Sequence, residues 1–348
     1  IVAHLRGEQA PGIPFSTERF VLAAIDLAPA DTATLDPTIV SALITSDGGP
    51  QSHTAILARQ LGIPAVVAAK GVESIEPGTV VYVDGAAGTV TSEFGDRERE
   101  LSATWYELVK NPLTYSGGGA ELSDGTRVPL LANVGGEKDA ALAAEANADG
   151  VGLFRTEFCF LDRDEEPSIE EQAEAYAGVL RHFPGKKVVI RTLDAGADKP
   201  LPFLTDADEP NPALGVRAYR TSWEKRSVLE NQLTAIAKAS RETSAEPWVM
   251  APMISTLEDT EDFVLMARSA GVERAGIMVE TPSAALTSDH LMGVADFASI
   301  GTNDLTQYTM AADRMLGSLA QLNDPWQPAV LALVGATATG ARVAGGDP

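Results

Sequence analysis

Residues Gly150-Val151-Gly152-Leu153-Phe154-Arg155 form a short apolar run that ends on an arginine. A second run of this kind, residues 187–193, contains Arg191, and longer helical patterns separate such runs from one another. The full series comprises residues 128–134, 150–155, 187–193, 214–218, 248–254, 276–280 and 297–301. Strands that alternate with helices predict a parallel sheet, and this many repeats favour an α/β fold of the (β/α)₈ barrel type. Seven strands predict a barrel that lacks its last unit.

The region before residue 92 has a different pattern. Short apolar runs with turn residues between them lie at 20–24, 42–45, 63–68 and 80–85. The last run leads through Ala86-Ala87-Gly88 into residues 89–91, which predicts a hairpin. A helical pattern covers residues 54–61. These features predict a small β-rich domain with few helices.

Residues 94–111 predict a charged, amphipathic helix that ends at Asn111-Pro112, and a glycine run at 117–119 follows it. A helix and a glycine run between two differently patterned regions are typical of a linker. We therefore expect a first domain at 1–92, a linker helix and glycine run at 93–120, and a truncated barrel at 121–348.

Composition and charge exclude several classes of protein. The 348 residues are 45% hydrophobic and include 26 Lys and Arg against 49 Asp and Glu, a net charge of −23. This charge repels nucleic acids and anionic membranes, and no apolar run is long enough to span a bilayer. The single cysteine, Cys159, indicates a reducing compartment, which we expect to be the cytoplasm. Because the first residue is Ile and the last residues resemble a loop, we expect a piece of a longer protein, cut at both ends.

Arginines follow the apolar residues of several predicted strands. Arg155, Arg191 and Arg217 each stand directly after such residues, and Arg314 comes later in the chain. The loops at the carboxyl ends of barrel strands carry the active sites of this fold. Guanidinium groups that converge there form a site for a small polyanion, such as a carboxylate or a phosphate.

Two carboxylates, Glu280 and Asp304, follow neighbouring predicted strands at the same edge. One possibility is that they pair with the arginines. The other is that they hold Mg²⁺, which keeps several waters and takes few protein ligands. The residues alone leave both possibilities open.

A histidine in the first domain is a candidate nucleophile. His53 follows Gly48-Gly49 and stands at the first turn of the predicted helix. A neutral imidazole there can attack phosphorus, and the helix N-terminus favours the phosphate that results. The alternative is a polar helix cap, but the glycine pair and the separate arginine pocket favour the nucleophile.

Several motifs in order carry a resemblance to a known family. They lie at residues 48–59, 150–158, 190–199, 277–282 and 301–308. On these motifs the chain resembles Enzyme I of the bacterial phosphoenolpyruvate-dependent sugar phosphotransferase system, over nearly its whole length.

The resemblance implies a function for individual residues. It implies that His53 is phosphorylated on Nε2 by phosphoenolpyruvate and passes the phosphoryl group to the carrier protein HPr. The arginines that bind phosphoenolpyruvate would be Arg155, Arg191, Arg217 and Arg314, with Asn303 beside them, and the Mg²⁺ ligands would be Glu280 and Asp304. The resemblance also implies a homodimer formed through the barrel. Because His53 must reach two partners in turn, we expect the first domain to swivel about residues 92–120.

Three departures from the family pattern matter. Gln51 stands where the histidine signature usually has threonine. Nothing resembles the helical HPr-binding insert of the family, and the chain stops before the segment that carries a cysteine thought to protonate the enolate.

Other functions remain as alternatives. A pyruvate phosphate dikinase or phosphoenolpyruvate synthase shares the swivelling histidine domain and the barrel, but it uses ATP. A regulator would bind phosphoenolpyruvate without turnover. A metal-dependent barrel lyase or aldolase would leave the His53 domain unexplained.

Overall fold

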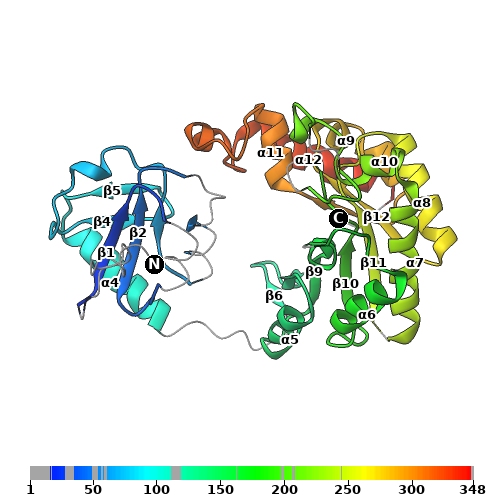
Figure 1. Ribbon diagram of the computed structural model, residues 1–348, viewed down its shortest axis with the longest axis horizontal. Coiled ribbons are helices and arrows are strands. Elements are labelled where there is room, and N and C mark those ends of the chain that lie inside the picture. The colour runs from blue at the N-terminus through cyan, green and yellow to red at the C-terminus, as the bar shows by residue number, and fades with distance from the viewer. Residues whose placement is uncertain are drawn as a thin grey trace. The chain divides into compact units, whose positions relative to one another are not determined.

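The computed structural model describes residues 16, 18–27, 35–48, 54–55, 58, 61–110, 119–161, 163–196, 200–205, 208–243 and 245–345 (Figure 1). Contacts divide the chain into two compact units. The first consists of Ile1–Leu113 with Met310–Asp324, and the second of Thr114–Thr309 with Pro325–Pro348.

The first unit contains a small parallel sheet and a hairpin. The sheet has the order β1-β2-β3 and comprises β1 (Phe20–Ala24), β2 (Val40–Thr45) and β3 (Ala65–Val66). The expected hairpin is confirmed as the antiparallel pair β4 (Tyr82–Asp84) and β5 (Thr89–Thr91). Asp84 closes its turn by accepting hydrogen bonds from the backbone N–H groups of Ala86 and Ala87, at 3.0 and 2.8 Å.

The core of this unit lies between the parallel sheet and the helical residues that follow it. Leu22 of β1 and Leu43 of β2 are buried against Ala58 and Ile63. Thr54, Ala55 and Ala58 are helical, as the pattern at 54–61 predicts. The histidine of that segment lies outside the described residues.

The expected amphipathic helix is confirmed as α4, Asp96–Lys110. Asp96 and Glu98 lie in its first turn, where carboxylates interact favourably with the positive end of the helix dipole. A short antiparallel pair then follows, β6 (Ala120–Glu121) and β7 (Arg127–Val128). Among the described residues, the first unit also contains two 3₁₀ turns, Val72–Ser74 and Gly317–Leu322.

The second unit is built on a parallel sheet. Within the described part of the chain this sheet has six strands in the order β13-β12-β11-β10-β9-β8. They are β8 (Leu131–Val134), β9 (Gly150–Arg155), β10 (Lys187–Arg191), β11 (Glu246–Ala251), β12 (Arg274–Val279) and β13 (Ala298–Ile300). Because every pair is parallel, all carboxyl ends meet at one edge.

Helices connect these strands, and several of them lie side by side along one flank of the sheet (Figure 1). They are α5 (Glu137–Glu145), α6 (Ile169–Leu180), α7 (Arg226–Glu242), α8 (Leu257–Ala270), α9 (Pro282–Leu286), α10 (Ser288–Met292), α11 (Thr302–Met310) and α12 (Pro328–Val343). The ends of α6 and α8 follow from the sequence. Ser168 and Glu171 form a reciprocal cap at the start of α6. Thr256 caps α8, and Gly271 ends it with the left-handed backbone that glycine adopts readily.

One expected strand is wrong. Residues 214–218 do not form a strand but a loop between two 3₁₀ turns, Pro212–Leu214 and Ala218–Trp223. Pro212 begins the first turn, and Ala218 takes φ 53° directly after an extended Arg217. The turns on both sides leave too short a stretch for a ladder of hydrogen bonds. The sheet is therefore a parallel half-barrel in the described residues, with β8 and β13 at its edges.

The main core lies between this sheet and its helices. Phe154 and Ile190 of the sheet are buried in one cluster with Tyr176 of α6 and Leu233 of α7. Burying such side chains contributes roughly 1.5–3 kcal/mol each to the stability of the fold. The strands are therefore held in place by a well-packed core up to their carboxyl ends.

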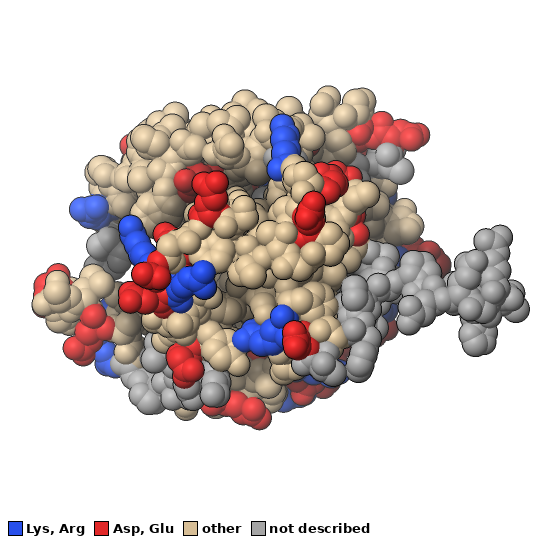
Figure 2. All heavy atoms as spheres, turned by 90° about the vertical axis from the view of Figure 1, so that its left-hand side faces the viewer, with Lys and Arg blue, Asp and Glu red and all other residues tan. Residues whose placement is uncertain are grey.

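Charged side chains on the face shown in Figure 2 are mixed in sign, with uncharged surface between them. Among the described residues, no helix is both long enough and apolar enough to cross a lipid bilayer.

Candidate active site

Polar side chains converge at the carboxyl edge of the half-barrel. Arg155 and Arg191 end β9 and β10 and stand opposite each other in the register of the two strands. Glu280 follows β12 directly, and Asp304 lies in the first turn of α11, just after β13. This edge is where α/β proteins with parallel strands place their ligand sites.

Arg191 is held by two carboxylates. Only 7% of the residue is exposed, and its guanidinium pairs with Glu157 and, at 3.1 Å, with Asp194. Burial opposes the charged form, but the charges of Asp194 and Glu157 outweigh it and raise the pKa of Arg191 above its ordinary value. Arg191 therefore stays positively charged.

Arg217 occupies a still more buried position, with 2% exposure. Its guanidinium lies 3.1 Å from Asp194 and 3.5 Å from Asp304. Asp194 thus bridges the two buried arginines. Tyr308, on the same helix as Asp304, donates a hydrogen bond to the carbonyl of Ala213 and ties α11 to the loop that carries Arg217.

Glu280 is 2% exposed and is enclosed by backbone. Its Oε2 accepts a hydrogen bond of 2.8 Å from the N–H of Met253, a residue with a left-handed backbone at φ 60°. A Cβ at Gly301 would lie 2.5 Å from the Glu280 side chain, so position 301 requires glycine. A left-handed backbone at a non-glycine residue is a strained conformation of the kind found at functional sites.

The Glu280 carboxyl holds its proton unusually tightly. Burial, together with the negative charges of Asp304 and Asp194, raises its pKa from 4.5 to about 7, against the opposing effects of Arg191 and of the hydrogen bond from Met253. The ionised form is therefore unfavourable unless another positive charge is near.

The buried cluster carries more negative than positive charge. Arg191 and Arg217 face four carboxylates, which are those of Glu157, Asp194, Glu280 and Asp304. The described residues contain no group of three or more His, Cys, Asp or Glu side chains arranged to hold a metal by themselves. Mg²⁺ typically binds one or two carboxylates, with water and phosphate oxygens as its other ligands. The excess negative charge and the two carboxylates at the sheet edge fit such an ion.

The structure brings together Arg191, Arg217, Glu280 and Asp304 among the predicted site residues. The possibility that a carboxylate pairs with an arginine holds for Asp304, which contacts Arg217.

The other predicted residues are not part of this buried cluster. Arg155 is exposed, with its guanidinium 5.3 Å from the ring centre of Phe158. Asn303 is exposed at the start of α11, and Arg314 is half-buried in the segment Met310–Asp324, which contacts assign to the first unit. His53 lies outside the described residues.

Glu157 and Asp194 are site residues that the sequence motifs did not predict. Each of them is the acid of a strand-end motif, Arg155-Thr156-Glu157 or Arg191-Thr192-Leu193-Asp194. The pattern that could have identified these two residues is an acidic residue two or three positions after an arginine at the end of a strand. Only the folded chain reveals that Glu157 pairs with Arg191, a residue of the next strand, and not with its neighbour Arg155.

The raised pKa of Glu280 predicts a pH-dependent stability. The pKa of Glu280 is higher in the folded than in the unfolded chain, so the folded chain binds this proton more tightly. The resulting contribution to the free energy of unfolding is complete below about pH 4.5 and is lost as the pH rises through about 7. We expect Glu280→Gln to stabilise the metal-free protein above pH 7, by up to about 3 kcal/mol, and to change little at pH 4.5. Urea unfolding of both proteins between pH 4.5 and 8 measures the difference. Parallel curves would contradict the prediction.

Comparison with known proteins gives the family. The model of the PEP-binding domain of the PEP-utilising enzymes matches residues 116–347, and the model of their mobile domain matches residues 16–88. The chain belongs to the PEP-utilising enzymes. The half-barrel of this PEP-utilising enzyme, with its arginines and carboxylates, is therefore the PEP-binding domain.

Curated relatives of this PEP-utilising enzyme share one name, phosphoenolpyruvate-protein phosphotransferase. The protein of Streptomyces coelicolor is 52% identical over 99% of this chain, and those of Staphylococcus carnosus and Bacillus subtilis are each 39% identical over 96%. The chain spans 62% of the length of the first relative and 61% of the other two. The family resemblance found in the motifs is confirmed.

Proposed function

We propose that this chain transfers the phosphoryl group of phosphoenolpyruvate to Nε2 of its own His53 and then to a histidine of the carrier HPr. The observation that carries the proposal is the buried Arg191–Asp194–Arg217–Asp304 cluster at the carboxyl edge of the PEP-binding domain. The name shared by the relatives supports the choice of reaction.

Binding of phosphoenolpyruvate is assigned to the arginines. Arg191 and Arg217 are held in place by carboxylates on neighbouring segments, so their donors are oriented before substrate arrives. Arg155, at the exposed end of β9, is free to turn toward a phosphate or a carboxylate. Arg314 and Asn303 complete the proposed binding set.

Glu280 and Asp304 are assigned to Mg²⁺. When bound, this ion supplies positive charge to the phosphoryl oxygens and to the carboxylates around them. Glu280 must lose its proton to act as a ligand, and the hydrogen bond from the Met253 N–H to its Oε2 holds the carboxyl group in place.

The transfer step breaks one bond and forms another. The lone pair of the neutral imidazole Nε2 of His53 attacks phosphorus, and the bond from phosphorus to the enolate oxygen breaks, so that pyruvate leaves as its enolate. The guanidinium groups stabilise the negative charge that develops on the phosphoryl and enolate oxygens. The protein contributes mainly by positioning the reactants and by stabilising this charge.

The proposal also requires movement of the first domain. We assign residues 1–92 to a swivelling phosphohistidine domain, residues 93–120 to its linker, and residues 121–348 to a (β/α)₈ barrel without its last unit. The match of residues 16–88 to a mobile-domain model and the helix α4 within the linker support this division. In the same proposal the protein is cytoplasmic and forms a homodimer through the barrel domain.

Labelling with phosphoenolpyruvate tests the proposed function. The intact protein is incubated with Mg²⁺ and phosphoenolpyruvate that carries a radioactive phosphoryl group. We expect one acid-labile phosphate per chain, which passes to added HPr. Labelling from ATP instead would favour a dikinase or synthase. Binding of phosphoenolpyruvate without any labelling would favour a regulator.

A further inference from the structure

Gln232 is a buried amide in an otherwise apolar helix face. It lies in the middle of α7 and is 1% exposed, between the buried side chains of Leu229 and Leu233. Burying an amide is unfavourable unless every polar atom finds a partner. The contacts of this side chain therefore identify what it stabilises.

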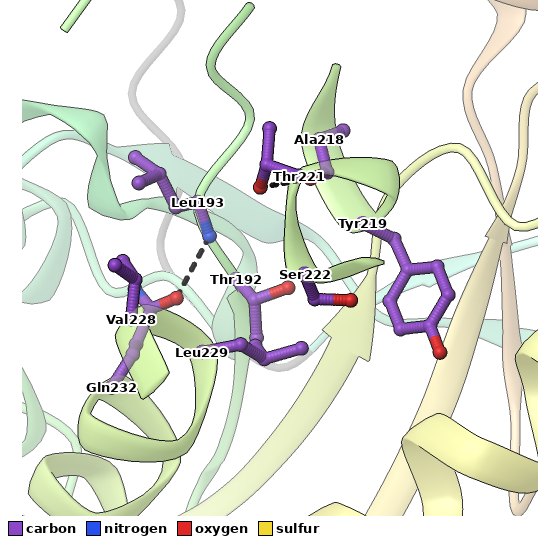
Figure 3. A pocket seen from close by; sticks show the side chains of 9 residues that line it. All are labelled: Thr192, Leu193, Ala218, Tyr219, Thr221, Ser222, Val228, Leu229 and Gln232. Carbon is purple, nitrogen blue, oxygen red and sulfur yellow. Dashed lines mark hydrogen bonds between the residues drawn. The ribbon is translucent and has the colours of Figure 1, made fainter. Parts of the chain in front are cut away.

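The carboxamide of Gln232 joins the ends of two strands. Its Oε1 accepts a hydrogen bond of 2.9 Å from the backbone N–H of Leu193, after β10 (Figure 3). Its Nε2 donates to the hydroxyl of Thr156, after β9, at 3.0 Å. It also donates to the hydroxyl of Tyr176 on α6, at 3.0 Å.

These contacts reach Arg191 from both sides. The Thr156 hydroxyl, which accepts from Gln232, donates to the carbonyl of Arg191 at 2.9 Å. The N–H of Leu193, two residues after Arg191, donates to the same carboxamide. The residues that pair with the Arg191 guanidinium are Glu157, directly after Thr156, and Asp194, directly after Leu193. The side chain of Gln232 thus sets the spacing of the two segments that carry the charges of Arg191, Glu157 and Asp194.

The direction of each hydrogen bond fixes the orientation of the amide. Tyr176 donates to Gln172 at 3.0 Å and Gln172 donates to the carbonyl of Pro167 at 2.9 Å, so Tyr176 can only accept from Gln232. A reversed carboxamide would place its NH₂ group against the N–H of Leu193. An adjacent cavity of about 10 Å³, lined in part by Leu193 and Gln232, is too small for another side chain to take over these contacts (Figure 3).

We infer that Gln232 is a positioning residue that holds Arg191, Glu157 and Asp194 in the arrangement that binds the phosphate of phosphoenolpyruvate, an inference that rests on the proposed function. Gln232 does not touch the substrate. It acts through the backbone of residues 191–194 and through Thr156.

Two variants separate positioning from simple stability. Gln232→Met keeps the length of the side chain but removes every hydrogen bond. The matched control, Tyr176→Phe, removes a hydroxyl from the same buried network but leaves the contacts of Gln232 with Leu193 and Thr156 intact. Dissociation constants for phosphoenolpyruvate are measured with Mg²⁺ on the intact protein carrying His53→Ala, so that no phosphoryl transfer disturbs the equilibrium, at a temperature where thermal unfolding shows all variants folded.

We expect Gln232→Met to weaken binding at least about tenfold and Tyr176→Phe to change it less than about twofold, although both lower the melting temperature. A third variant, Gln232→Glu, keeps the test decisive if the methionine variant does not fold. Its protonated carboxyl can accept from Leu193 and donate to Thr156, so its affinity relative to wild type should rise as the pH falls.

Equal losses of affinity in Gln232→Met and Tyr176→Phe, or a Gln232→Glu variant with the pH profile of the wild type, would overturn the inference. Failure of the wild type to bind phosphoenolpyruvate would instead overturn the proposed function, and the inference with it.

Discussion

Replacing His53 with alanine is expected to abolish labelling of the protein by phosphoenolpyruvate. The proposed reaction needs a lone pair on Nε2, and alanine offers no atom that can accept the phosphoryl group. Binding of phosphoenolpyruvate should survive, because the arginines and carboxylates of the buried cluster all belong to the second unit. Labelling is measured after gel separation at neutral pH, and binding by calorimetric titration of the unlabelled protein.

His182→Ala is the matched control for this variant. His182 follows α6, its side chain is 32% exposed, and its nearest acidic partner, Glu137, lies 3.9 Å away. Losing this imidazole should leave labelling within about twofold of the wild type, because substitutions at the surface that break no buried contact usually have small effects. A His53→Ala protein that still takes up one acid-labile phosphate would place the phosphoryl acceptor elsewhere and remove the central step of the proposal.

Replacing Arg217 with methionine is expected to destabilise the second unit and to suppress labelling together. The side chain is almost fully buried, and its removal leaves Asp194 and Asp304 without the guanidinium between them. Breaking a buried ion pair from one side costs about 3–5 kcal/mol. Removing a donor that stabilises charge in the transition state lowers the rate by about 10²–10³-fold. Urea unfolding and initial labelling rates measure the two effects.

A double variant separates these two effects. In the Arg217→Met background Asp194 keeps only Arg191 as a partner, and the cluster has a larger excess of negative charge. Asp194→Asn replaces this carboxylate with a neutral amide, so part of the lost stability should return. The labelling rate should stay low, because the guanidinium is still missing. If the double variant recovered labelling along with stability, Arg217 would stabilise the fold without binding substrate. A normal labelling rate in Arg217→Met alone would exclude Arg217 from the site.

The chemical character of the site followed from short segments of sequence. Arg155 and Arg191 end runs such as Lys-Val-Val-Ile, and an apolar run bounded by charge predicts a buried strand with a polar residue at its end. Glu280 and Asp304 follow strands in the same way. Parallel pairing then places these ends at one edge, so the meeting of Arg191, Glu280 and Asp304 could be predicted without coordinates.

The loop at 214–218 shows where this reasoning fails. Leu214, Val216 and Ala218 alternate with other residues as a strand would, but Pro212 and Gly215 break the run into turns. A run this short is ambiguous from periodicity alone. The prediction that Arg217 reaches the site survived for a different reason, because the N–H of Ala218 donates to the carbonyl of Ala195 and returns the loop to the end of β10.

The sequence by itself predicted seven parallel strands, of which the described part of the structure shows six, the arginines that end β9 and β10, and the family. These depend on residues close together in the chain, whose patterns are local. Only the tertiary structure decided that Asp194 bridges two arginines, that Glu157 pairs across to the next strand, and that Gln232 holds both segments from α7. Apart from the pair of Arg191 and Asp194, these contacts join residues far apart in sequence, and packing of the helix against the sheet brings them within hydrogen-bond distance.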